Sequence, residues 1–197
     1  MTTYLDNSGS WVPRQSAGYN PGDFVICRPP AITGLPQHVY RVLQGGSNPQ
    51  FEIFNGVLAQ SAVAASVTGT LTETVLASIT VPGGIVGSNG SLRITPIWTV
   101  GNNANGKTGA VKFGGVAHAT HALANGASAG SMFTIRNRGV LNSQITYAGA
   151  PGTVNTVSNT TTAINTAVDQ ILQITGTLTN TGDTLTLEGY TVELDPA

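Results

Sequence analysis

The sequence predicts an all-β protein, in which a small N-terminal β-module precedes an antiparallel β-sandwich or barrel. Only 9% of the 197 residues are charged, against about 25% in an average soluble domain. Thr, Ser and Asn supply most polar positions, which suits strands better than helices. From residue 71 onward, about seven short segments alternate polar and apolar residues between turn residues, a pattern typical of a sandwich or barrel.

Residues 1–55 form the expected N-terminal module. They hold six of the ten prolines, and three strand-like segments lie among them: Gly22–Arg28, His38–Gln44 and Phe51–Phe54. Proline this dense excludes long helices and confines strands to edges and short pairs.

Four aromatic side chains gather in this module: Trp11, Tyr19, Phe24 and Tyr40. We expect Phe24 and Tyr40 in its core. Trp11 and Tyr19 are either core residues or an exposed row that stacks on a sugar ring or holds another protein.

Residues 56–70 are small and uncharged, and their apolar positions do not repeat at a helical period. We interpret this segment as an extended linker, with a short helix over Val57–Ala65 as the alternative.

Residues 71–197 form the expected sandwich domain. Along Leu92–Val100, apolar residues such as Leu92 and Trp98 share one face, whereas Arg93 and Thr95 share the other. The last expected strand is Asp183–Leu194. Its apolar residues have odd numbers up to Leu187 and even numbers from Tyr190 onward, so one extra residue lies between them. This predicts a β-bulge at Glu188-Gly189. The other expected strands lie in Thr72–Val81, Gly109–Gly114, Met132–Arg138, Asn142–Ala148 and Asp169–Leu178.

Two connections are rich in turn residues. Asn105-Gly106 predicts a type I′ turn in a hairpin that joins Leu92–Val100 to the next strand, because both central positions of that turn favour such residues. Pro82–Ser91 is the second connection, and its glycines lack the Lys-Ser or Lys-Thr of a phosphate-binding loop.

The charges are unevenly distributed. Between Thr74 and Val168 every charge is positive, and from Asp169 onward every charge is negative. Either strands of the two halves pair and neutralise each other within one sheet, which needs fewer assumptions, or the charges form a contact between subunits.

Residue sets with catalytic or metal-binding chemistry do not stand out. We interpret His118 and His121 as hydrogen-bonded loop residues, with a surface or inter-subunit metal as the alternative. Glu193 and Asp195 are a poor acid–base pair at a chain terminus, no Gly-x-Ser-x-Gly elbow occurs, and Cys27 is interpreted as a structural residue. We therefore expect no enzyme and no cofactor.

The sequence also suggests where the chain resides. The net charge of −1 gives no pull toward nucleic acid or acidic membranes. We see no secretory leader at Met1–Ser10 and no apolar run of membrane-spanning length. We therefore expect a chain that is made in a cytoplasm.

Two segments of the N-terminal module, Tyr19–Pro30 and His38–Pro49, contain Gly22-Asp23, a strand, and a Gly-Ser-x-Pro turn. With this pattern the module resembles a small β-module of many tailed-bacteriophage virion proteins. The opening Tyr-x-x-Gly-Asp-x-Val is also similar to carbohydrate-binding modules of chitinases, although their paired tryptophans after the second strand are missing here.

The later segments Thr72–Gly115, Ile135–Ala148 and Leu178–Leu194 resemble the C-terminal β-domain of phage head-decoration, head-fibre or tail-fibre proteins. This resemblance implies a jelly-roll-like antiparallel β-sandwich, a homotrimer and no catalytic residues. It implies a virion protein that decorates or projects from the capsid, with the major capsid protein or other virion proteins as partners.

Two alternatives stay open. One is a tail-fibre or receptor-binding tip that recognises a host glycan through its polar loops, and the other is a stand-alone carbohydrate-binding module. The candidate binding surface comprises Trp11, Tyr19, Asn103, Asn105 and Lys107.

Overall fold

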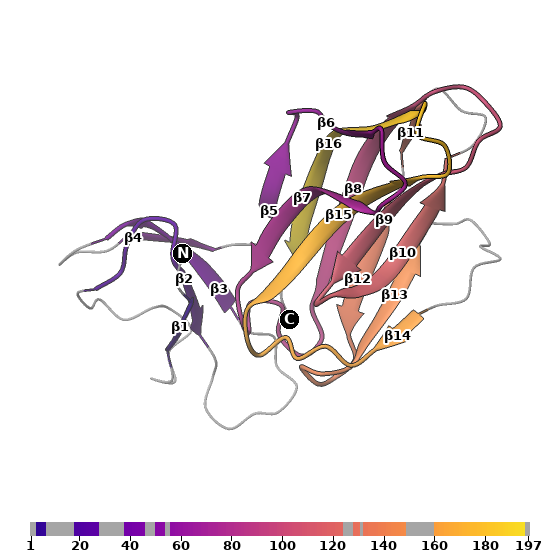
Figure 1. Cartoon of the computed structure of the whole chain (residues 1–197). Helices are drawn as coiled ribbons and strands as arrows, with labels where there is room; N and C mark the ends of the chain where they lie inside the picture. The colour runs from indigo at the N-terminus through magenta and orange to yellow at the C-terminus, as the bar shows by residue number, and fades with distance from the viewer. Residues whose placement is uncertain are drawn as a thin grey trace.

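The structure is a computed structural model of the chain, and it describes residues 3–6, 18–27, 38–45, 50–53, 56–123, 128–130, 132–148 and 160–195. These residues form sixteen β-strands and no helix. Consequently, the described part of the chain offers no helix that could cross a membrane. Figure 1 shows a small N-terminal sheet beside a larger sandwich of two sheets.

The N-terminal sheet has four strands in the order β1-β2-β3-β4. The first strand is parallel to β2, and the other neighbours are antiparallel. The bounds are Thr3–Asp6 for β1, Phe24–Cys27 for β2, His38–Gln44 for β3 and Gln50–Ile53 for β4. The strands expected in this module from Gly22, His38 and Phe51 onward correspond to β2, β3 and β4.

The larger sheet of the sandwich has eight strands. Its order is β14-β13-β12-β8-β16-β5, with β11 paired to β8 and β6 paired to β16. The bounds are Gly56–Ser61 for β5, Ala65–Thr68 for β6, Ser91–Val100 for β8, Ser128–Gly130 for β11, Phe133–Asn137 for β12, Gln144–Ala148 for β13, Thr160–Thr162 for β14 and Thr184–Asp195 for β16.

The smaller sheet has four antiparallel strands in the order β10-β9-β15-β7. The bounds are Thr74–Val81 for β7, Lys107–Phe113 for β9, Val116–Ala122 for β10 and Gln170–Leu178 for β15. The all-β prediction, a small N-terminal sheet followed by an antiparallel β-sandwich, is confirmed.

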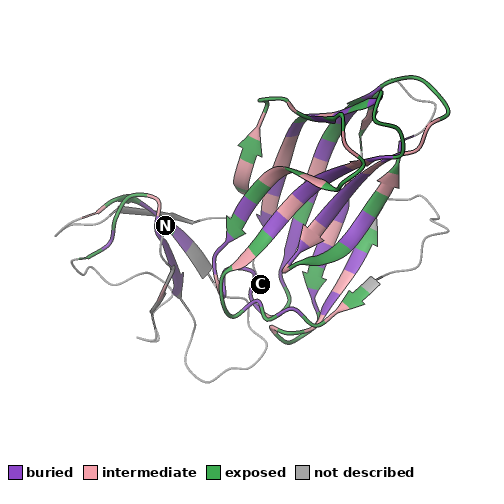
Figure 2. Ribbon diagram, viewed as in Figure 1, coloured by how far each residue is buried: buried purple, intermediate pink, exposed green. Residues whose placement is uncertain are grey.

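The core lies between the two sheets of the sandwich, and buried and exposed residues alternate along their strands (Figure 2). Trp98 of β8, Phe113 of β9 and Leu172 of β15 are each at most 1% exposed. Phe24 and Ile26 of β2 belong to the same apolar cluster, so one face of the N-terminal sheet joins the sandwich core.

The segment 56–70, for which we predicted a linker, instead contains strands β5 and β6. Both pair with β16 at the edge of the eight-stranded sheet. Because edge strands built from small residues bury few side chains, this segment lacks the regular apolar alternation by which the other strands are recognised.

The predicted hairpin at Asn105-Gly106 is also wrong. Strand β8 ends at Val100 in the larger sheet, whereas β9 begins at Lys107 in the smaller sheet, so the connection crosses between sheets. The tight turn lies instead at Gly114-Gly115, which joins β9 to β10. Both glycines have positive φ, 56° and 80°, as the central residues of a type I′ turn require.

The predicted bulge in the last strand is confirmed. The register of β16 on β8 shifts between Leu187 and Gly189. As a result, Leu187 and Val192 are both buried although their numbers differ in parity.

Candidate functional site

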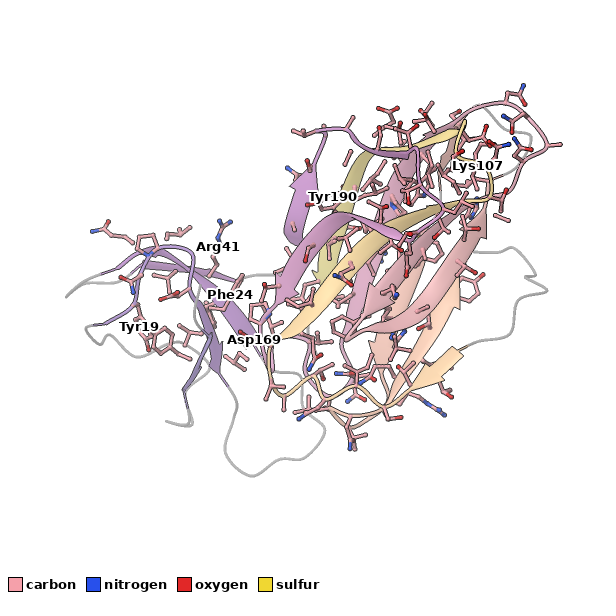
Figure 3. The ribbon with its side chains drawn as sticks, viewed as in Figure 1. Tyr19, Phe24, Arg41, Lys107, Asp169 and Tyr190 are labelled. Carbon is pink, nitrogen blue, oxygen red and sulfur yellow. The ribbon has the colours of Figure 1, made fainter. Side chains whose placement is uncertain are left out.

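Lys107, a predicted binding residue, lies buried where the connection from β8 enters β9 (Figure 3). Its ammonium group donates to Asn103 Oδ1 at 2.6 Å and to the carbonyl of Asn105 at 3.0 Å. The carboxylate of Asp183 lies 3.7 Å from Lys107 Nζ. The charge of Lys107 is therefore used inside the protein and is not presented to a ligand.

Asn103 connects the two charged groups of this cluster. Its side-chain oxygen accepts from Lys107, and its Nδ2 donates to Asp183 Oδ1 at 2.7 Å. This hydrogen bond, with the nearby ammonium of Lys107, lowers the pKa of the Asp183 carboxyl. The structure thus brings Asn103, Asn105 and Lys107 together in an arrangement that fixes the loop.

The other predicted binding residues lie in the N-terminal part. Tyr19 is 9% exposed and packs in a small apolar cluster with Val25, Tyr40 and Val42. The ring of Tyr4 meets it edge-on at 4.9 Å, so Tyr19 offers no open platform to a sugar ring. Trp11 lies outside the described residues.

His118 is a strand residue of β10, which corrects our interpretation of it as a loop residue. It is 4% exposed. Its Nδ1 lies 2.5 Å from Thr146 Oγ1, and its Nε2 lies 3.5 Å from Thr162 Oγ1. These threonines belong to β13 and β14, so His118 links the two sheets. Burial lowers the pKa of His118 to about 4.

His121 also lies in β10 and is partly exposed. Within the described part of the chain, His, Cys, Asp and Glu side chains form no group of three that could hold a metal ion.

A second buried polar cluster lies at the end of the sandwich opposite Lys107. Gln144 accepts from the backbone N–H of Ile164 at 2.8 Å and donates to the carbonyl of the same residue at 2.9 Å. It also donates to Asn137 Oδ1 at 2.9 Å. Asn137 in turn donates to Thr166 Oγ1 at 2.9 Å. These bonds fix the loops that close this end of the sandwich.

The uneven charge distribution has an intramolecular explanation for two pairs. Arg93 of β8 and Glu193 of β16 are opposite one another in register, and their side chains lie 3.5 Å apart. Lys107 and Asp183 form the second pair. The interpretation that strands of the two halves neutralise each other within one sheet is therefore confirmed for Arg93 and Glu193. Lys107, in the smaller sheet, pairs instead with Asp183 in the connection before β16. It does not account for the other charges of the two groups, which form no ion pair with another described residue: Arg136, Arg138, Asp169, Glu188 and Asp195.

The β-bulge in β16 creates a hollow of about 510 Å³ on the larger sheet. We call it the bulge hollow, and it is lined by Gln60, Ser61, Ala62, Ile97, Glu188, Gly189, Tyr190 and Thr191. Ile97 is 53% exposed there, and Gly189 contributes no side chain to fill the space. Sequence reasoning predicted the bulge but not the hollow, because the lining residues of β5 were assigned to a linker.

A second hollow, of about 380 Å³, lies between the N-terminal sheet and β5. Phe24 and Arg41 line one side of it, and Val57–Gln60 line the other. This hollow follows from the packing of the N-terminal sheet beside the sandwich edge.

No model of a known protein family matches the sequence, and no curated protein matches it. Dimeric latent PorU from Porphyromonas gingivalis is similar in structure with a TM-score of 0.33 and 11% identity, over 73% of this chain and 14% of that chain. The Gt strain of infectious bursal disease virus gives a TM-score of 0.26 and 12% identity, over 86% of this chain and 51% of that chain. The Gx strain gives 0.25 and 10%, over 82% and 51%.

These likenesses are limited to a β-rich fold. The chain spans a small part of the PorU chain and about half of each virus chain.

Proposed function

We propose that this chain is a non-enzymatic structural protein of a bacteriophage virion, which decorates or projects from the capsid surface and stabilises the particle. In this role it acts by binding as a homo-oligomer, for which the phage resemblance of the sequence implies a trimer. Several weak contacts to capsid subunits then add up, because linked binding sites gain avidity.

The observation that carries this proposal is that the buried polar side chains form hydrogen bonds within the chain, while the exposed surface of the sheets carries little charge. The ammonium of Lys107, the imidazole of His118 and the amide of Gln144 are all buried and engaged with other parts of the chain. What the sheets offer to solvent is mainly Thr, Ser and single apolar residues. A surface with little charge fits the central part of a protein contact, where charged residues are depleted.

The proposal is tested on a phage that encodes this chain. We expect the protein in purified particles, and we expect particles from a deletion strain to lose infectivity faster on heating or osmotic shock. Supplying the intact gene in trans is the control and restores resistance. Unchanged resistance of the deletion particles contradicts a stabilising role, and absence of the protein from wild-type particles contradicts a virion role altogether.

A further inference from the structure

Lys107, Asn103 and Asp183 place an amine, an amide and a carboxylate within reach of one another. The side chain of Lys107 is fully buried, and that of Asp183 is 7% exposed. Lys107 Nζ lies 2.6 Å from Asn103 Oδ1, and Asn103 Nδ2 lies 2.7 Å from Asp183 Oδ1. The amine therefore meets the carbonyl end of the amide group, and the carboxylate meets its nitrogen end.

The second carboxylate oxygen of Asp183 lies beside the amine. Asp183 Oδ2 is buried and has no hydrogen-bond partner within the described part of the chain, and Lys107 Nζ lies 3.7 Å from it. Such an oxygen can accept a proton from the ammonium group, because the transfer converts two buried charges into two neutral groups. A lysine that loses its proton in this way becomes a nucleophile.

The ion pair is the resting form of this cluster. The hydrogen bond from Asn103 and the nearby charge of Lys107 lower the pKa of the Asp183 carboxyl, so the neutral pair is the minor form. The fixed geometry offsets this disadvantage. Groups held in contact within one molecule react as if at an effective concentration of about 10⁵ M or more.

We propose that Lys107 forms an isopeptide bond with the side chain of Asn103. Lys107 Nζ attacks Asn103 Cγ, so a C–N bond forms there and the bond from Cγ to Nδ2 breaks. One proton of the ammonium group passes to Asp183 and a second passes to the departing nitrogen, which leaves as ammonia. The products are a secondary amide, a protonated Asp183 and ammonia, so atoms and charge balance without an oxidant or cofactor. Asn103 is itself exposed, which gives the ammonia a way out to solvent.

The bond closes a ring in the connection that carries the chain from β8 in the larger sheet to β9 in the smaller sheet. It forms once in each chain, without turnover. This inference goes beyond the proposed virion role and does not depend on it, so either can fail while the other stands.

The test is mass spectrometry of tryptic peptides from the purified, denatured full-length chain. Trypsin cleaves after lysine but not after a lysine whose amine is acylated. We expect the peptide Ile94–Lys112, uncleaved after Lys107 and lighter than its sequence by one ammonia. Asp183→Asn removes the proton acceptor with little change in shape. It should restore both cleavage after Lys107 and the full mass of the resulting peptides.

Lys112→Arg is the matched control. Lys112 belongs to the same strand as Lys107 and pairs with Glu73 at 2.8 Å, so this variant should keep the ammonia loss. Thermal unfolding verifies that Asp183→Asn is folded, and a bond that still forms in this folded variant overturns the role of Asp183.

Three results overturn the bond itself. The first is a wild-type chain that is cleaved after Lys107 into peptides of full mass. The second is loss of water with the peptide joined to the one that holds Asp183, which makes Asp183 the acylating group. The third is an ammonia loss that persists in Lys107→Arg, which assigns it to ring closure at Asn105-Gly106.

Discussion

Gly109 of β9 lies against the indole ring of Trp98 of β8, across the interior of the sandwich. A methyl group added at Gly109 would lie 2.7 Å from the ring atom Cζ2 and 2.9 Å from Cε2, which is closer than carbon atoms can pack. Trp98 is 1% exposed and is held among other core residues, so its ring has little room to move away.

We therefore expect Gly109→Ala to lower the free energy of unfolding by about 1 to 3 kcal/mol, the usual cost of overpacking a core. Urea unfolding monitored by the fluorescence of the tryptophans measures the change. Gly130→Ala is the control, because a methyl group at Gly130 in β11 meets no atom within 4 Å. Equal changes in the free energy of unfolding for the two substitutions would contradict the close packing of Gly109 against Trp98.

The buried amide of Gln144 gives a second prediction. In Gln144→Ala the backbone N–H and carbonyl of Ile164 lose their partners at 2.8 and 2.9 Å. An unsatisfied buried polar group costs about 1 to 3 kcal/mol, so we expect a loss of about 2 to 4 kcal/mol in unfolding free energy. Gln173→Ala, at a partly exposed position of β15, should cost under about 0.5 kcal/mol. A similar loss of unfolding free energy in both variants would indicate that the hydrogen bonds of Gln144 do not stabilise the fold.

The buried imidazole of His118 predicts a dependence of stability on pH. Its pKa is lowered from 6.5 to about 4 in the folded protein, so the unfolded chain binds the proton more tightly. The contribution of neutral His118 is fully present above pH 6.5 and is lost as the pH falls toward 4. The unfolding free energy should decrease by up to about 1.4 kcal/mol per pH unit in this window.

His118→Gln removes this part of the pH dependence. His121→Gln, at a partly exposed site in the same strand, leaves it in place. Denaturant titrations between pH 4 and pH 7 compare the three proteins, and an unchanged slope in His118→Gln would assign the acid sensitivity to other groups.

The turn at Gly114-Gly115 gives a prediction that depends on the backbone alone. Gly115 has a φ of 80°, and an added methyl group would meet no atom within 4 Å. We expect Gly115→Ala to cost about 1 to 2 kcal/mol because the left-handed conformation is strained for residues with a Cβ. Gly115→Asn should cost less, since Asn adopts this conformation more readily. Calorimetric melting temperatures should rank the proteins in the order wild type, Asn, Ala.

Much of the fold could be predicted because the alternation of polar and apolar residues along a strand can be recognised within a short segment of sequence. Leu92, Ile94 and Trp98 are core residues as expected, and the parity change before Tyr190 correctly located a bulge. The pairing of strands depends on distant segments and was harder to predict. Asn105-Gly106 is a good local turn signal, yet β8 and β9 pair with β16 and β15 instead of with each other.

The candidate site was harder to predict than the fold for a similar reason. Asn103, Asn105 and Lys107 are polar residues in a loop, which usually indicates exposure. The carboxylate that draws Lys107 inward is Asp183, which comes from a connection many residues later. Burial of Tyr19 against Tyr4 likewise depends on a contact between separate segments, which no local pattern indicates.

Strand β16 is second from one edge of the larger sheet, with β8 on one side and β5 and β6 on the other. During synthesis on the ribosome, these three strands emerge long before their shared neighbour. Until β16 is made, each of them leaves a row of backbone groups without its final partner, and such edges invite pairing with other chains. Folding of the sandwich is therefore completed late, and a nascent chain that stops short of residue 184 lacks the strand that holds the sheet together.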